Sequence, residues 1–240
     1  MIAAAIDKIV SMAKPIIIDV DGEKYSTEHI MRVPAELRAE PLEVATLTSL
    51  VQYILDFPED MKEIPAFVHV ISHKRVELLT ALDSDRKREC LMIVKSETPD
   101  IPFGRYLENE NMIIAIQSMF KDDPTTDKET ILRFTGTVTS GSIKEYGDDG
   151  VTQKATIKQG VASKTEAIVP SPCLLRPYRT FAEVEQPASK FIFRMRELRE
   201  DVIESALFEA DGGAWKNEAR ENIRNYLEEK LKGTNIKVIA

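Results

Sequence analysis

Three stretches of the chain repeat apolar residues at the spacing of an amphipathic helix. The first covers residues 42–55, with Pro41 expected in its first turn. The second follows Asn109, a residue type that often caps a helix N-terminus, and the third runs from Trp215 to a closing Gly233. The apolar stripes are Leu47, Leu50, Val51 and Ile54; Met112, Ile113, Ile116 and Phe120; and Trp215, Ala219, Ile223, Tyr226 and Leu227. Each helix is therefore predicted to bury one face.

Between these helices, apolar residues alternate with polar ones, which predicts strands. Polar Ser72-His73-Lys74 and the acidic stretch 147–150 each separate two such runs and predict hairpin turns. Residues 160–187 are expected to be strand or loop, because their four prolines oppose helix. The predicted strands are residues 67–71, 76–82, 89–95, 130–138, 151–157, 190–196, 203–210 and 236–239. Because strands cluster and hairpins recur, the fold is predicted to be α+β, a largely antiparallel sheet packed by three main helices.

Residues 1–40 are predicted to form an N-terminal arm. It contains a short apolar helix, followed by a hairpin of residues 16–20 and 24–26 that turns at Asp21-Gly22. The remaining residues, 41–240, are predicted to fold as a single α+β domain.

Composition limits the classes of protein to which the chain can belong. The 240 residues are 43% hydrophobic and 30% charged, an ordinary globular balance. The apolar start carries Asp7 and lacks the basic N-terminal end of a secretory signal, and no stretch approaches the roughly 20 apolar residues of a membrane span. Spacing does not exclude a disulfide between Cys90 and Cys173, although their apolar surroundings favour free thiols in a reducing compartment. We therefore expect a cytoplasmic protein without membrane partners.

Charge is unevenly distributed along the chain. Residues 151–196 hold eight basic and three acidic residues, a net charge of +5, which leaves −13 for the rest of a chain that carries −8 overall. Aromatic residues accompany the basic ones, as in grooves that bind single-stranded nucleic acid. The alternative is a charged sheet face with Phe191 and Phe193 in the core. The candidate binding residues in this stretch are Lys154, Lys158, Arg176 and Arg179.

A second candidate site is the Asp211-Gly212-Gly213 turn that leads into the last helix. Free N–H groups at such a helix start can hold an anion. However, the carboxylate of Asp211 is a natural N-cap that would occupy those donors. We therefore favour a capped tight turn, with Trp215 as a packing anchor, over ligand binding.

The chain lacks the commonest catalytic templates. It contains no GxSxG, Walker A or GxGxxG motif, and His69 and His73 lie in a predicted strand and turn without the HExxH pattern of a zinc site. The apolar setting of Cys173 is expected to raise its pKa, the opposite of what a nucleophile needs. We predict no catalytic residue, metal ligand or cofactor, and an enzyme is the less favoured interpretation.

Five segments of the chain, taken in order, resemble the YfdQ-like family of phage and prophage proteins. The segments are PFGRYL at 102–107, DDGVTQ at 148–153, KQGVA at 158–162, PYRTFAEVEQP at 177–187 and LFEADGGAW at 207–215. The resemblance spans roughly residues 40–230, and the N-terminal arm has no counterpart in it. It implies a phage-encoded protein in the bacterial cytoplasm, and it brings no established activity, cofactor or catalytic residue.

Three functions fit these observations. The leading hypothesis is a non-enzymatic phage accessory protein that binds a partner, such as a host protein, and forms a homo-oligomer in which acidic and basic faces pair. The second is a nucleic-acid-metabolism factor that binds single strands through residues 151–196. The third is a nucleotide-binding or counter-defence protein with an anion near residues 211–213.

Overall fold

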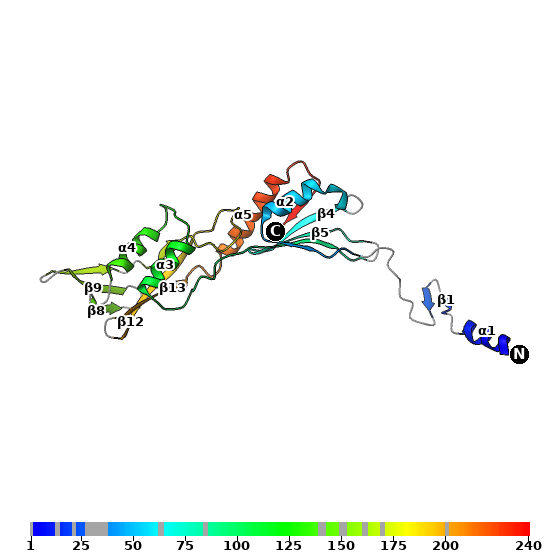
Figure 1. The fold of residues 1–240 in the computed structure, drawn as a ribbon, viewed down its shortest axis with the longest axis horizontal. Helices are drawn as coiled ribbons and strands as arrows, with labels where there is room; N and C mark the ends of the chain where they lie inside the picture. Colours follow the sequence, from blue (N-terminus) through cyan, green and yellow to red (C-terminus); the bar gives the residue numbers. More distant parts are fainter. Residues whose placement is uncertain are drawn as a thin grey trace. The chain divides into compact units, whose positions relative to one another are not determined.

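The computed structural model describes residues 2–12, 15–20, 23–26, 38–61, 65–83, 86–138, 143–148, 153–159, 163–168, 171–199 and 202–240. The chain divides into two compact units, Met1–Arg38 and Ala39–Ala240, which are described separately (Figure 1). No helix in the described parts is long and apolar enough to cross a membrane.

The first unit contains a helix and a hairpin. Helix α1 is Ile2–Met12, and strands β1 (Ile17–Val20) and β2 (Glu23–Ser26) pair antiparallel. Val20 lies opposite Glu23, and the predicted turn residues 21 and 22 lie outside the described residues. A helix and an antiparallel strand pair thus lie where a short helix and a hairpin were predicted.

The second unit begins with a five-stranded sheet in the order β14-β4-β5-β6-β3. Strands β4 (Ala66–Ser72), β5 (Arg75–Thr80) and β6 (Cys90–Lys95) form the predicted meander. The predicted terminal strand, β14 (Lys237–Ile239), pairs parallel with β4. Helices α2 (Leu47–Asp56) and α5 (Trp215–Lys230) lie over this sheet, and a short 3-10 helix, η1 (Pro58–Met61), follows α2 (Figure 1).

These elements enclose a first hydrophobic core. All four apolar residues predicted on the α2 stripe are buried, and from α5 Ile223 and Leu227 are fully buried. The predicted start of the first helix is wrong, because Leu42–Val44 form strand β3, parallel to β6. Helix α2 begins later because Thr46 is its N-cap, and the Thr46 hydroxyl accepts a hydrogen bond from the Ser49 N–H.

A second hydrophobic core lies against a four-stranded antiparallel sheet in the order β11-β12-β13-β7. The strands are β11 (Cys173–Leu175), β12 (Ser189–Arg199), β13 (Val202–Glu209) and β7 (Leu107–Glu108). Helices α3 (Asn109–Met119) and α4 (Lys128–Thr137) contribute to this core, and the predicted Phe191 and Phe193 lie within it.

Helix α4 replaces the strand predicted at residues 130–138. Buried Ile131 and Thr135 of α4 and the buried C-cap residue Val138 recur at i, i+4 and i+7, so the segment also carries a helical period. Asn109 is not the N-cap of α3, a position that Glu108 occupies. Instead the Asn109 amide donates to the Val138 carbonyl at 2.6 Å and accepts from the Ser205 hydroxyl at 2.6 Å, which ties α3 to the end of α4 and to β13.

A three-stranded antiparallel sheet has the order β10-β9-β8. Its strands are β8 (Ile143–Asp148), β9 (Gln153–Gln159) and β10 (Ser163–Ile168). Asp148 lies opposite Gln153, as expected for a hairpin at this place, although residues 149–152 lie outside the described residues. Together these sheets and helices confirm the α+β class, including the long C-terminal helix.

Candidate functional site

The segment between β11 and β12, residues 176–188, which we call the bridging loop, connects the two cores. The strands on either side of it place Cys173, Leu175 and Phe191 in the second core. Phe181 and Val184, from the middle of the loop, belong to the first core and are 1% and 8% exposed. The strands that flank the bridging loop thus pack in the second core, while two apolar side chains from the middle of the loop pack in the first core.

Gln186 holds the bridging loop in shape. Its side chain is 3% exposed, and its Oε1 accepts hydrogen bonds from the Arg179 and Thr180 N–H groups at 3.0 and 3.2 Å. Its Nε2 donates to the carbonyls of Phe181 and Val184 at 2.9 and 3.3 Å. One buried amide thus pairs with four backbone groups of the same loop, which a buried polar side chain requires.

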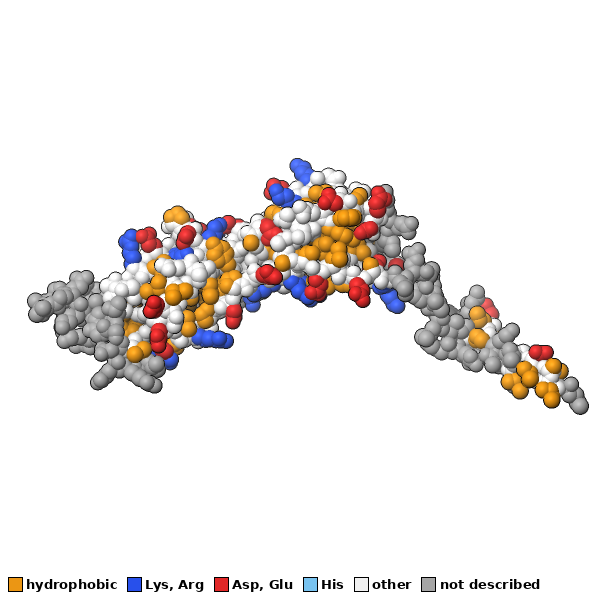
Figure 2. All heavy atoms as spheres, in the orientation of Figure 1, with side chains coloured by type: hydrophobic (Ala, Val, Ile, Leu, Met, Phe, Trp, Pro, Cys, Tyr) orange, Lys and Arg blue, Asp and Glu red, His pale blue; other side chains and the backbone are white. Residues whose placement is uncertain are grey.

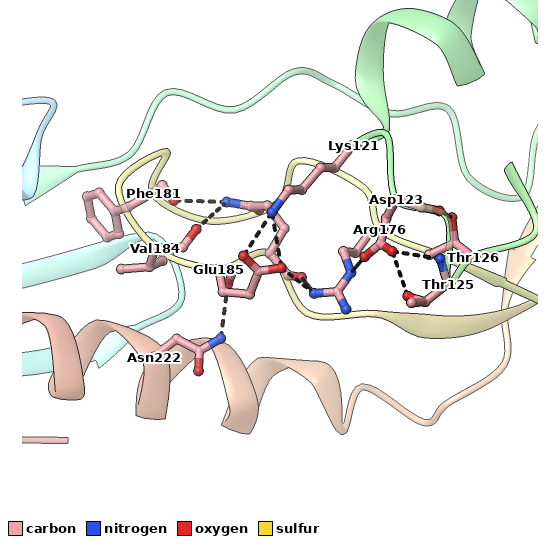
Figure 3. Close-up of polar contacts among 10 residues, drawn as sticks. Lys121, Asp123, Thr125, Thr126, Arg176, Phe181, Val184, Glu185 and Asn222 are labelled. Atoms are coloured by element: carbon pink, nitrogen blue, oxygen red, sulfur yellow. Dashed lines mark hydrogen bonds and ion pairs between the residues drawn. The ribbon is translucent and has the colours of Figure 1, made fainter.

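Ion pairs and a hydrogen bond connect the bridging loop to the segment after α3 and to α5. Figure 3 shows Glu185 facing Lys121 and Arg176, at Nζ–Oε2 and Nη1–Oε1 distances of 2.8 and 2.5 Å. Arg176 also pairs with Asp123 at 2.7 Å. From α5, Asn222 donates to the Glu185 carbonyl at 3.0 Å. These contacts join the segment after α3 to α5 through the bridging loop.

The loop also contacts the first sheet and α2. The Thr180 hydroxyl donates to the His73 carbonyl in the β4–β5 turn at 2.6 Å. The Glu183 carboxylate accepts from the Thr48 N–H at 3.2 Å, in the first turn of α2. A carboxylate at this position interacts favourably with the positive end of the helix dipole.

Arg179 is a buried cation at the end of this network. Its side chain is 5% exposed and pairs with Glu209 at 2.6 Å, while its Nη2 donates to the Ser189 hydroxyl at 2.5 Å. The guanidinium carbon lies 3.7 Å from the ring centroid of Trp215 and 5.6 Å from that of Phe191. Burial lowers the pKa of Arg179, while Glu209 opposes that shift.

The turn before α5 is closed by Asp211. Its carboxylate accepts hydrogen bonds from the N–H groups of Gly213 at 3.0 Å and Trp215 at 3.3 Å. The two glycines have φ angles of +63° and +82°, which side chains with a Cβ rarely adopt. Asp211 therefore occupies the donors, as expected, although the residue in the N-cap position itself is Ala214.

Trp215, 5% exposed, is packed from two sides. Arg179 covers its ring, and the imidazole of His73 meets it edge-on with a centroid distance of 4.7 Å. Burial, together with the nearby cations Lys74, Lys216, Arg179 and Arg220, lowers the pKa of His73 to about 4. His73 is consequently neutral at pH 7, and the predicted role of Trp215 as a packing anchor agrees with these contacts.

The sequence-derived candidates occupy three places. Arg179 and the 211–213 turn come together around Trp215, whereas Arg176 pairs with Asp123 and Glu185 in the bridging loop. Lys154 and Lys158 lie on β9, in the three-stranded sheet, and Lys158 is opposite Lys164 in register. The two arginines are therefore engaged within the chain.

Sequence reasoning missed Gln186, Glu185 and His73 as parts of one network. Their partners are far away in sequence, since Thr180 contacts His73 across 107 positions. The only available signal was the segment 177–187, singled out by the family resemblance.

Cys173, whose thiol could act as a nucleophile, is buried in the second core. Burial raises the pKa of the Cys173 thiol to about 12, as its apolar setting predicted, and both cysteines are free. Within the described residues, no group of three or more His, Cys, Asp or Glu side chains is placed to hold a metal ion.

Comparison of the chain with protein-family models, with curated proteins and with solved structures found no match in any of the three.

Proposed function

We propose that this protein acts by binding rather than by catalysis, and that it self-associates through the N-terminal unit. The observation that carries this proposal is the apolar surface of α1. Ile2, Ile6 and Ile9 are 80%, 54% and 66% exposed. Figure 2 shows hydrophobic side chains at the surface of this helix.

The spacing of these isoleucines supports a helix–helix contact. Positions i, i+4 and i+7 match the d, a and d positions of a heptad, a narrow seam typical of coiled coils. An isolated helix of 11 residues is marginal in water, so α1 needs a packing partner to be stable. A second copy of the same helix offers a seam of matching shape.

The hairpin of the N-terminal unit adds to this argument. A lone two-stranded hairpin is marginally stable in water. Its apolar residues Ile17, Ile18, Val20 and Tyr25 are all between 47% and 63% exposed. Contact with the same unit of another copy removes this surface from water.

A lipid surface fits α1 less well than a second copy does. Helices that bind anionic membranes carry several basic residues on their polar face. Helix α1 carries one acidic residue, Asp7, and one basic residue, Lys8.

Charge pairing between subunits receives less support. Arg176, Arg179 and Arg196 pair with carboxylates of their own chain. These three side chains are thus satisfied without a partner subunit, and the apolar arm replaces charge segregation as the main argument for an oligomer.

Light scattering coupled to size exclusion tests the proposal on the full chain. We expect a mass that is a multiple of 27.1 kDa and that persists at high salt, because apolar contacts are not screened. Ile6→Asp with Ile9→Asp is expected to shift the protein to monomer. Ala4→Asp is the control, since it adds a charge to the same helix at a position off the seam. A wild-type monomer at every concentration, or equal masses for the seam and control variants, would refute self-association through α1.

The phage-encoded origin and bacterial cytoplasmic setting are proposals that rest on the family resemblance.

The second candidate function, single-strand binding, now rests on β9, because Lys154 and Lys158 lie on it and Lys164 lies opposite Lys158. Lys154→Gln with Lys158→Gln is expected to weaken binding of a labelled single strand and to flatten its salt dependence. Absence of binding by the wild type at low salt excludes this function.

A further inference from the structure

A cavity of about 260 Å³ lies beside Trp215. The β4–β5 turn, the segment 98–103, the bridging loop, the end of β13 and the start of α5 all contribute to its wall. The charged and aromatic residues that matter here are His73, Lys74, Asp100, Arg179, Trp215 and Lys216. The site is thus assembled from segments of both cores.

Two lysine side chains on this wall are not neutralised by a carboxylate of the described residues. Glu209, also part of the wall, is paired with Arg179. Among the described residues, the ammonium groups of Lys74 and Lys216 have no carboxylate within ion-pair distance. With Asp100 as the remaining acid, the lining keeps a net positive charge of one.

Two residues that line the cavity each carry a buried hydrogen-bond donor without an acceptor in the described part of the chain. Trp215 Nε1 and Arg179 Nε are both buried without a partner among the described residues, and both side chains are 5% exposed. Buried donors in native proteins are nearly always paired, so an unpaired donor calls for an explanation such as a ligand or water. Trp215 and Arg179 both line the cationic cavity, so an acceptor bound in that cavity is the explanation tested below.

The backbone at the helix start is not the site, because Asp211 already occupies the N–H groups of Gly213 and Trp215. An anion near residues 211–213 would therefore contact side chains of the neighbouring cavity rather than these N–H groups. Neutral His73 can donate a hydrogen bond there without adding a charge.

We propose that this cavity binds a small oxyanion, a phosphate or carboxylate group, between Lys74 and Lys216 and against Trp215. Its volume lies just below the roughly 300–1,000 Å³ of sites that enclose drug-sized ligands, so it suits a single anionic group rather than a dinucleotide. Such a site is independent of self-association through α1, and either property stands if the other fails.

Fluorescence provides a direct test, because Trp215 is the only tryptophan in the chain. The full-length protein is titrated at constant ionic strength with inorganic phosphate, with benzoate and with chloride. We expect a saturable change of emission with phosphate or benzoate and none with chloride. Comparison of the first two distinguishes a phosphate site from a carboxylate site.

Variants locate the binding. Lys74→Gln with Lys216→Gln, two exposed side chains, is expected to weaken anion binding about tenfold or more. Lys232→Gln, which removes an exposed charge beyond the end of α5, is expected to bind like the wild type. The proposal is overturned if neither anion gives a saturable change, or if the double variant binds as tightly as Lys232→Gln.

Discussion

Replacing Arg179 tests whether the junction between the two cores, which is formed by the bridging loop and its contacts, depends on the buried guanidinium of this residue. Arg179→Ala removes the guanidinium that lies 3.7 Å from the Trp215 ring centroid and 5.6 Å from that of Phe191. It also removes the partners of Glu209 and of the Ser189 hydroxyl. The substitution leaves a void beside the start of α5 and an unpaired carboxylate at the end of β13.

The expected loss of stability follows from three contributions. A desolvated cation–π contact contributes about 2 kcal/mol, and the hydrogen bond to Ser189 about 1 kcal/mol. Breaking a fully buried ion pair costs about 3 to 5 kcal/mol, but Glu209 is 39% exposed, so water rehydrates most of its charge. We therefore expect the free energy of unfolding to fall by about 3 kcal/mol in total.

Urea denaturation monitored by circular dichroism and by Trp215 fluorescence measures this change. Arg133→Ala is the matched control, because the Arg133 and Glu129 side chains are 78% and 77% exposed and form a surface pair on α4. Such a pair contributes about 0.3–0.5 kcal/mol. A double-mutant cycle of Arg179→Ala with Glu209→Ala isolates the ion pair. If Arg179→Ala lowers the free energy of unfolding no more than Arg133→Ala does, Arg179 does not stabilise the junction.

Two further predictions concern the same region. Gln186→Leu removes the hydrogen-bond partners of four backbone groups. In urea denaturation the free energy of unfolding is expected to fall by about 2–4 kcal/mol. A fall of less than about 0.5 kcal/mol contradicts the role of the amide. The pKa of His73 falls from 6.5 to about 4 on folding, so the unfolded chain binds the proton first and stability is lost as pH drops from about 6.5 to 4. After a discount for the partial exposure of the imidazole, this loss is about 1–2 kcal/mol. A His73→Asn variant should lack that part of the pH dependence, and identical slopes for both proteins contradict it.

Local periodicity predicted much of the fold because one-sided burial leaves a clear pattern. In the α2 stripe the four buried positions were identified from their spacing, and the β4–β5–β6 meander was predicted from alternating runs on either side of polar turns. Residues 130–138 misled because Leu132 and Phe134 alternate with polar residues as in a strand, while Ile131, Thr135 and Val138 follow a helical period. Packing against the second core decides between the two patterns, and that information is not local.

The junction could be predicted only in fragments. Arg179 was predicted to be a binding residue because it belongs to the basic stretch 151–196. Its burial depends on Trp215 and Glu209, which lie some 30 or more positions later in the chain. Similarly, the bridging loop shows no periodicity, and its conformation depends on the buried amide of Gln186.

Sedimentation equilibrium on the full-length protein tests the central claim, self-association through the N-terminal helix, most directly. We expect a wild-type mass that is a multiple of 27.1 kDa, retained by Ala4→Asp and reduced to 27.1 kDa by Ile6→Asp with Ile9→Asp. A wild-type chain that sediments at 27.1 kDa at all concentrations contradicts it.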